Sequence, residues 1–486
     1  MPCTTILVGK KASHDGSTII SRNDDGGFEP KKLIVVKPEE QPREYKTIIS
    51  HLTVALPDNP LRFTCAPNVN TKRGVWPACG INSANVAMTA TETVTSNPRV
   101  VGADPYVVYQ EGDEAEGKSE VPGGIGEEDL VTIVLPYIRT AREGVLRMGE
   151  LLEQYGTYEP NGMAFADADE VWWLETIGGH HWIARRVPDE NVVIMPNQFG
   201  LDRFDFADAY GEKKENLCSA DLREFVEKHH LYTGRDGAFN PRLAFGSRSD
   251  SDHIYNTPRA WFMARYFLER SYKWDGDNAD LTPESNDIPW TFVPERKVTV
   301  EDVRYLLGSH YQGTPYNPYD ERAQFKGKYR TIGVPNSDVC GIMQLRGYLP
   351  EAVRGVQWFS MGGSGFTACF PLYTNVDTLP AYFSETKEEV CTDNMYWQSR
   401  LIAALVDAHY FTSVIFSERY QSAVFNKSRE LLYTCDDKAL AGEEVDLEKV
   451  NAEIAAMVKK QSDATLGSIL ADASEHMRIR YHRGDN

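Results

Sequence analysis

The stretch Cys3-Thr4-Thr5-Ile6-Leu7-Val8-Gly9 follows Met1 and Pro2, and its apolar run predicts a buried strand. The turn residues Asp15-Gly16-Ser17 come next, and Thr18-Ile19-Ile20-Ser21 predicts a second strand that ends on Arg22-Asn23-Asp24-Asp25. Two strands joined in this way form a β-hairpin, which returns an arginine and aspartates toward the cysteine. This stretch therefore indicates both the start of a sheet and a candidate reactive centre.

Cys3 gains unusual chemistry if Met1 and Pro2 are removed, because one residue then carries both a thiol and a free α-amine. The ordinary pKa of an α-amine is about 7.7–8.0 and that of a cysteine thiol is about 8.5. The amine can therefore take the thiol proton near neutral pH and activate the sulfur as a nucleophile. The alternative interpretation is that Cys3 is an incidental small apolar residue.

The overall composition is that of an ordinary globular protein, with 486 residues, 41% hydrophobic and 25% charged. This length allows about two to three domains. The formal net charge of −20 argues against nucleic acid or an anionic membrane as partner, since both are polyanions. The sequence shows no apolar stretch of about 18 residues, so we expect no transmembrane helix, and its start has no secretory signal pattern.

The eight cysteines are spread through the chain without clustered spacing. That pattern favours reduced thiols over a disulfide framework or a zinc site, and a cytoplasmic location follows. The paired histidines, at 180–181 and 229–230, match no metal-binding motif, and their ordinary interpretation is as turn and surface residues. We therefore expect no metal and no cofactor.

The pattern along the chain predicts strands in the first 200 residues and helices in the last third. Acidic residues Glu127-Glu128-Asp129 open a helix whose apolar positions run on to Leu146, and residues 162–199 resemble a β-meander. Further helices are expected over 258–272, 300–308, 394–434 and 445–481, and Gly362-Gly363-Ser364-Gly365 reads as a loop before a strand. The expected fold class is α+β.

Two residues beyond the hairpin are candidates for the same site. Asn197 directly follows a strand, where its carboxamide can donate to a developing oxyanion, although a turn-forming asparagine is the ordinary alternative. Arg259 falls in the first turn of a helix that begins near Pro258, where an arginine opposes the helix dipole. Arg259 therefore either serves something outside that helix or is a surface charge.

Taken together, these segments resemble the dipeptidase A family of bacterial cysteine hydrolases, which belongs to the N-terminal nucleophile hydrolases. The resemblance covers nearly the whole chain. It is carried by these segments: Cys3–Ser13, Asp15–Thr18, Arg22–Asp25, Gly126–Leu130, Thr140–Gly144, Val171–Asp189, Trp358-Phe359 and Phe370–Tyr373. A more distant similarity runs to penicillin V acylase and bile salt hydrolase, which share the Cys…Arg-Asn-x-Asp start. The family implies an αββα sandwich over residues 3–390 with a mainly helical C-terminal extension, residues 391–486, packed on it.

The wider superfamily implies a role for each matching residue. Cys3 matches the nucleophile, with its own α-amine as base. Arg22 matches the arginine beside the thiolate, where a cation lowers the thiol pKa. Asp25 matches the aspartate that orients this amine, Asn197 the carboxamide of the oxyanion hole, and Arg259 a second arginine that holds the site together.

The chain departs from the distant relatives at Glu92, which stands ten residues beyond the turn residue Asn82 where they carry an asparagine or tyrosine. A backbone N–H near Thr91 or Glu92 is then the candidate second oxyanion donor. Because a dipeptide has a free amine, Glu92 is also the candidate to hold the substrate's α-ammonium. The alternative is that Glu92 is a solvent-exposed glutamate after a strand.

The leading function is a cysteine dipeptidase that acts on small dipeptides through a thioester on Cys3, as a cytoplasmic homo-oligomer. Because Met1 removal leaves a Pro2–Cys3 bond, exposing Cys3 needs self-cleavage or a proline-tolerant aminopeptidase. The alternatives are an amidase or acylase acting on N-acyl or conjugated small molecules, and a non-enzymatic secernin-like protein. A metal-dependent dipeptidase is disfavoured because the sequence has no ligand cluster.

Overall fold

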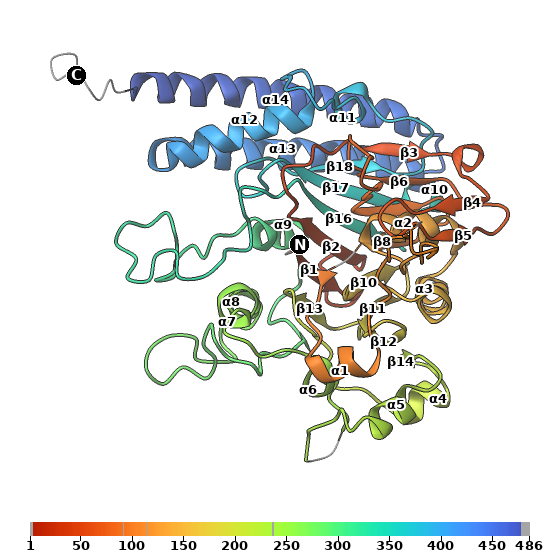
Figure 1. The fold of residues 1–486 in the computed structure, drawn as a ribbon. Coiled ribbons are helices and arrows are strands. Elements are labelled where there is room, and N and C mark those ends of the chain that lie inside the picture. The colour runs from red at the N-terminus through yellow and green to blue at the C-terminus, as the bar shows by residue number, and fades with distance from the viewer. Residues whose placement is uncertain (1–2, 91, 114, 236–237, 478–486) are drawn as a thin grey trace.

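Two antiparallel sheets pack face to face at the centre of the protein (Figure 1). The computed structural model describes residues 3–90, 92–113, 115–235 and 238–477. The first sheet has the order β15 (Thr291–Phe292), β13 (Val192–Met195), β1 (Thr4–Val8), β2 (Thr18–Asp24), β16 (Val339–Leu345), β17 (Gly355–Met361), β18 (Phe370–Tyr373). The hairpin expected from the N-terminal sequence is β1 and β2, and it lies in the middle of this sheet.

The second sheet is built mainly from the segment between residues 34 and 218. Its order is β14 (Asn216–Cys218), β12 (His181–Arg186), β11 (Val171–Ile177), β10 (Asn161–Ala166), β8 (Ala87–Thr89), β7 (Cys79–Asn82), β6 (Phe63–Cys65), β3 (Ile34–Val36). The short strand β9 (Glu92–Thr93) pairs with β10 beside this path, and β4 (Glu44–Lys46) pairs with β5 (Thr53–Ala55) in a separate hairpin.

The sheets and their helices form layers, and three clusters of buried apolar residues fill the space between these layers. Leu7 and Ile20 of the first sheet pack with Ala164 and Trp173 of the second, which fills the space between the sheets. The outer face of the first sheet packs on α8 (Thr257–Phe267) and α9 (Val300–Leu307), and that of the second on α2 (Glu127–Val134) and α3 (Ala141–Tyr155). Central strands such as β2 and β11 thus bury both faces, whereas the edge strands β3 and β15 stay partly exposed. The α+β prediction is confirmed.

The single helix expected from Glu127 to Leu146 is wrong, because the structure has two helices there. After α2, a short 3-10 turn (Leu135–Tyr137) contains Pro136, whose missing N–H cannot continue the α-helical bonding. Thr140 then starts α3 by accepting a hydrogen bond from the Glu143 backbone N–H at 3.1 Å. Apolar residues continue at helical spacing across the break, so the sequence pattern does not reveal it.

The expected β-meander is also only partly right. Strands β10, β11 and β12 form consecutive antiparallel pairs, as predicted. The fourth strand, β13, leaves them and pairs with β1 in the other sheet, where Thr5 lies opposite Met195. This crossing brings Asn197, which follows β13, to the end of the first sheet that carries Cys3.

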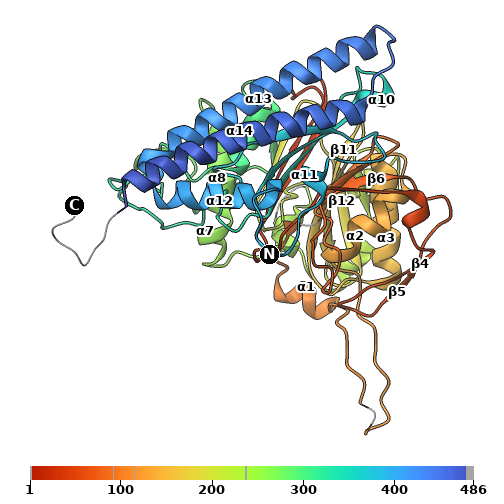
Figure 2. The same ribbon diagram turned by 90° about the horizontal axis from the view of Figure 1, so that it is seen from above.

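Three long helices cover one edge of the two-sheet core (Figures 1 and 2): α12 (Met395–Ala408), α13 (Tyr410–Leu440) and α14 (Leu447–Glu475). Ile454 and Val458 of α14 join the apolar cluster between the sheets. Asn451 also donates to and accepts from the backbone of Tyr373 on β18, at 3.0 Å in both bonds. These contacts hold the helices on the core, while the domain boundary between residues 390 and 391 stays a prediction.

The remaining helices are short. They are α1 (Pro98–Ala103), α4 (Phe206–Tyr210), α5 (Leu222–Lys228), α6 (Pro241–Phe245), α7 (Asp252–Tyr255), α10 (Glu351–Arg354) and α11 (Ala381–Ser384), with a 3-10 turn at Pro38–Glu40. Among the described residues, none of the helices combines the length and the apolar character needed to span a membrane. Gly362–Gly365 forms the loop between β17 and β18, as predicted.

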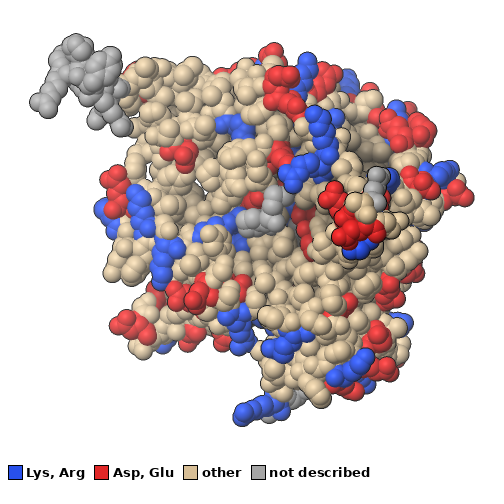
Figure 3. Space-filling model, in the orientation of Figure 1, with Lys and Arg blue, Asp and Glu red and all other residues tan. Residues whose placement is uncertain are grey.

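Acidic and basic side chains are interspersed on the face of the protein seen in Figure 3. The net charge of −20 is thus not gathered into one acidic patch on this face. The cysteines other than Cys3 are free thiols, in agreement with the prediction of reduced cysteines.

Candidate active site

Cys3 lies directly before β1 and is buried, with 1% of its surface exposed. In the hairpin Thr5 pairs with Arg22 and Leu7 pairs with Ile20, so alternate residues of both strands share one face of the sheet. Leu7 and Ile20 on this face pack between the sheets. The strand period therefore carries the side chains of Cys3 and Arg22 to the same face, where they meet at the end of the hairpin.

Arg22 is the immediate partner of the cysteine sulfur. Its Nη2 lies 2.9 Å from Cys3 Sγ and also 2.9 Å from Oε1 of Glu127, the first residue of α2. Burial by itself disfavours the charged guanidinium, yet the charges of Cys3, Glu127 and Asp24 hold the pKa of Arg22 well above its ordinary value. The same attraction acts in both directions, so Arg22 favours the thiolate form of Cys3.

Asp24 adds a second buried carboxylate beside the sulfur. Its Oδ1 lies 3.4 Å from Arg22 Nη2, and its Oδ2 lies 2.7 Å from Nζ of Lys31. Burial alone raises the pKa of a carboxyl, but Lys31 and Arg22 together hold the pKa of Asp24 below its ordinary value. Asp24 is therefore a charged, fully ion-paired group.

Within the described residues, one set of three side chains has the spacing of a metal site: Cys3, Asp24 and Glu127. One ligand atom from each lies within 4.8 Å of the others. Arg22 donates to all three of these side chains, so its guanidinium places one positive charge beside their sulfur and oxygens. This arrangement suits an ion-paired thiolate.

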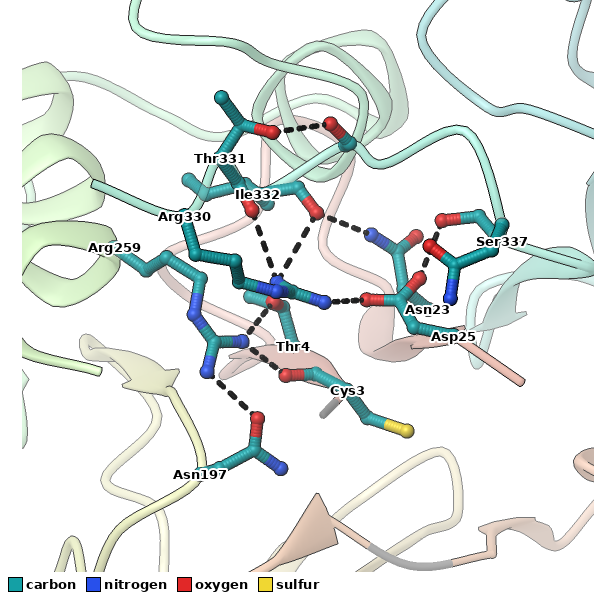
Figure 4. Close-up of polar contacts among 12 residues, drawn as sticks. Cys3, Thr4, Asn23, Asp25, Asn197, Arg259, Arg330, Thr331, Ile332 and Ser337 are labelled. Carbon is teal, nitrogen blue, oxygen red and sulfur yellow. Dashed lines mark hydrogen bonds and ion pairs between the residues drawn. The ribbon is translucent and has the colours of Figure 1, made fainter. Parts of the chain in front are cut away.

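Arg259 connects the start of β1 to Asn197 (Figure 4). Its Nη1 donates to the backbone carbonyl of Cys3 and, at 2.7 Å, to Thr4 Oγ1, while its Nη2 donates to Asn197 Oδ1 at 2.6 Å. The guanidinium is fully buried, and α8 begins at Thr257, two residues before it. The prediction that Arg259 serves something outside its own helix is confirmed.

The carboxamide of Asn197 has a fixed orientation. Because Arg259 occupies its oxygen, its nitrogen faces the other way and donates to the Thr93 carbonyl at 3.0 Å. Asn256 supports the backbone here, since its Nδ2 donates to the Asn197 carbonyl at 2.9 Å. The two contacts thus fix which way the amide nitrogen points, and the role of Asn197 as an oxyanion donor stays a prediction.

Asp25 directly follows β2 and is held by two long-range contacts. Arg330 pairs with its Oδ2, and Ser337 donates from its hydroxyl to Oδ1 (Figure 4). Both partners come from the segment that leads into β16, more than 300 residues along the chain. The carboxylate is therefore rigidly placed, and its expected action on the amine of Cys3 stays a prediction.

Of the two expected substrate-binding residues, the structure describes only Glu92. Thr91 lies outside the described residues. Glu92 begins β9, and its backbone pairs with Gly162 of β10 next to the pairing of Thr93 with Asn161. Thr93 accepts the hydrogen bond from Asn197, so the backbone of Glu92 is one residue from a contact of the site.

Three more buried acids surround the start of α2. Glu128 Oε2 accepts from the Tyr158 hydroxyl at 2.6 Å, and Asp129 Oδ1 accepts from the Tyr45 hydroxyl at 2.7 Å. Burial raises the pKa of both carboxyls well above the ordinary range. Burial, together with the nearby charge of Glu127, raises the pKa of Glu159 to about 7. These acids therefore hold protons at a pH where Asp24 has lost its own.

Sequence reasoning did not assign Lys31, Glu127 or Arg330 to the site. Glu127 stands in an acidic run whose favourable interaction with the helix dipole explains it without reference to Cys3. Lys31 and Arg330 occur in stretches without any motif, and only the fold brings them to Asp24 and Asp25. The adjacent aspartates were the available signal, since buried carboxylates need cationic partners.

The paired histidines belong to other parts of the surface. His180 and His181 sit at the turn into β12, and both ring Nδ1 atoms contact the Asp104 carboxylate, at 3.2 and 2.7 Å. These contacts and the backbone hydrogen bonds from both histidines, against the effect of burial, lower the pKa of Asp104 to about 2. This agrees with the interpretation of these histidines as structural turn residues.

Comparison with known proteins gives a consistent result. Residues 2–423 match the family model described as Peptidase family C69. A protein named "Dipeptidase" from Bifidobacterium longum (strain NCC 2705) is 51% identical over 507 residues, which cover 98% of this chain and 94% of that protein. "Probable dipeptidase A" from Streptococcus pyogenes serotype M3 (strain SSI-1) is 48% identical over 100% of both chains. "Dipeptidase A" from Lactobacillus helveticus is 40% identical over 99% of this chain and 98% of that protein.

Proposed function

This chain belongs to peptidase family C69, and from that premise we propose that it is a cysteine dipeptidase with Cys3 as its nucleophile. The observation that carries the proposal is the buried Cys3 sulfur, 2.9 Å from the guanidinium of Arg22. A cysteine thiolate is a strong nucleophile, and a neighbouring cation favours it over the thiol. The names of the relatives supply the substrate class.

In the proposed reaction the free α-amine of Cys3 takes the thiol proton, and the sulfur attacks the carbonyl carbon of a dipeptide. The peptide C–N bond breaks, the departing amino acid takes the proton from the α-ammonium, and the first amino acid remains as a thioester. Water then attacks the thioester carbonyl and gives a proton to the α-amine. The C–S bond breaks, and the proton returns to the sulfur as the first amino acid leaves.

The other predicted residues support these steps. Asn197 donates an amide N–H to the oxyanion of each tetrahedral intermediate, and Arg259 keeps that amide turned toward the reaction. A backbone N–H near Thr91 or Glu92 supplies the second donor, and Glu92 contributes negative charge for the substrate's amine. Asp25, held by Arg330 and Ser337, orients the α-amine of Cys3.

The mechanism requires that Cys3 become the first residue. We propose that Met1 and Pro2 are removed, either by self-cleavage of the Pro2–Cys3 bond or by an aminopeptidase that tolerates proline. An amide-linked nitrogen is not basic, so it cannot take the thiol proton.

We also propose that the protein works as a homo-oligomer in the cytoplasm. The free thiols of the cysteines other than Cys3 accord with a reducing compartment. Light scattering on the purified protein measures its mass in solution, and a monomer contradicts the oligomer proposal.

Turnover of a free dipeptide by wild type and Cys3→Ala tests the function. We expect hydrolysis by wild type, none by Cys3→Ala, and inhibition by iodoacetamide but not by EDTA. Cys391→Ala is the matched control, because it removes a more exposed thiol far along the chain. Wild-type rates in Cys3→Ala contradict the nucleophile. A wild-type protein that cleaves N-acyl amides but not dipeptides supports an acylase instead, and one without any hydrolysis supports the non-enzymatic alternative.

A further inference from the structure

We infer that Glu127 binds the α-ammonium of the substrate and thereby makes a free amine a requirement for hydrolysis. This inference rests on the proposed dipeptidase function and adds a substrate-binding residue to it. Three observations carry it: where the helix places Glu127, its distance from the sulfur, and the partners of its two oxygens.

The start of α2 is held firmly, so the side chain of Glu127 has a defined position. Glu159 Oε1 accepts the backbone N–H of Glu127 at 2.8 Å. Gly126, the residue before the helix, packs so closely on Tyr158 that an added Cβ would lie 2.2 Å from its hydroxyl oxygen. The helix therefore begins at one fixed point, from which Glu127 reaches Arg22 with 3% of its surface exposed.

The distance from the sulfur suits an α-amine. In the thioester, the substrate's nitrogen is three bonds from Cys3 Sγ, which keeps the two atoms within about 4 Å of each other. A carboxylate oxygen of Glu127 lies within 4.8 Å of the same sulfur. An ammonium bound to the thioester is thus within reach of a charge-assisted hydrogen bond of about 2.8 Å to that carboxylate.

Asp24 and Glu127 differ in how many of their carboxylate oxygens already have a cationic partner. Both oxygens of Asp24 already have a cation, Arg22 on one and Lys31 on the other. Glu127 pairs with Arg22 through Oε1 only, and within the described part of the chain no donor hydrogen-bonds to its Oε2. Glu127 therefore retains an acceptor for a third positive group.

Glu92 and Glu127 are compatible as binding residues, because an ammonium has three N–H donors. Their contributions separate by substitution. Glu127→Gln keeps an oxygen that accepts from Arg22 but removes the negative charge. Glu128→Gln is the matched control, because it neutralises the next residue of the same helix, which contacts Tyr158 rather than the sulfur.

The test compares kcat/KM for a free dipeptide with kcat/KM for its analogue in which hydrogen replaces the α-amine. We expect Glu127→Gln to shrink this ratio roughly 10- to 100-fold, as a lost charged hydrogen bond does. The ratio should stay as in wild type in Glu128→Gln. If Glu127 only positions Arg22, both substrates lose the same factor and the ratio is unchanged, which overturns the inference.

Two further measurements cover the remaining outcomes. Calorimetric binding of the free dipeptide and its amine-free analogue to Cys3→Ala, with and without Glu127→Gln, gives the same comparison without turnover. If Glu127→Gln does not fold, wild type and Glu92→Gln decide. Equal kcat/KM for both substrates in wild type overturns the inference, and a preference for the amine that survives in Glu92→Gln supports it. A ratio that collapses only in Glu92→Gln overturns it. If wild type cleaves no dipeptide, the proposed function itself has failed.

Discussion

The Nη2 atom of Arg22 lies 2.9 Å from the sulfur of Cys3, and both residues are buried. One guanidinium thus serves the nucleophile and two carboxylates, those of Glu127 and Asp24. Buried charges are tolerated only when they are paired. The ion-paired cluster therefore allows a thiolate to exist in the protein interior, and this relationship gives the first prediction.

Arg22→Lys should slow dipeptide hydrolysis roughly 10- to 100-fold, because one ammonium cannot reproduce the charged hydrogen bonds of the guanidinium. The pH profile of iodoacetamide reaction at Cys3 should move upward, since Arg22 and the thiolate stabilise each other. Peptide mass spectrometry measures the reaction, with Cys391 as an internal control. An unchanged profile at Cys3 contradicts the role of Arg22.

Asn197→Ala should lower kcat by about 10²–10³ and change KM much less, because oxyanion donors act mainly in the transition state. Gln198→Ala is the control, since it removes the neighbouring carboxamide. Steady-state kinetics on one dipeptide separate the two parameters. A change confined to KM reassigns Asn197 to substrate binding.

Glu128→Gln should make the protein more stable than wild type at pH 9 but not at pH 5. Burial raises the pKa of Glu128 in the folded state above its ordinary value of 4.5. The stability that its neutral form contributes is therefore complete below about pH 4.5 and is lost as pH rises through the raised pKa, by up to about 1.4 kcal/mol per pH unit.

Urea unfolding at the two pH values measures this difference in the free energy of unfolding. A glutamine at position 128 cannot ionise, and its carbonyl still accepts from Tyr158. Glu111→Gln, at an exposed position, should show no such pH dependence. A difference between Glu128→Gln and wild type that is equal at both pH values would show that Glu128 ionises normally in the folded protein.

Local sequence patterns predicted the parts of the site that depend on neighbouring residues. The apolar runs and the turn at Asp15-Gly16-Ser17 gave the hairpin, and strand alternation then brings Arg22 to Cys3. The unfavourable place of Arg259 in its helix indicated an external partner, which the structure identifies as Asn197 and the start of β1. The resemblance to the dipeptidase A family is confirmed as well.

The remaining features depend on how distant segments meet, which spacing does not encode. Strand β13 reads like the fourth strand of a meander, yet it is fully buried and pairs with β1 in the other sheet. Arg330 reaches Asp25 across 305 residues. The break after α2 is hidden by the continuous apolar spacing, and Glu127 is hidden by the ordinary preference of acids for helix starts.

The central claim is that Cys3 acts with its own free α-amine as base. The mass of the N-terminal peptide from purified, fully active protein tests it most directly. The account predicts a peptide that begins at Cys3, without Met1 and Pro2. Fully active protein that retains Pro2 ahead of Cys3 would contradict the account, because an amide nitrogen cannot accept the thiol proton.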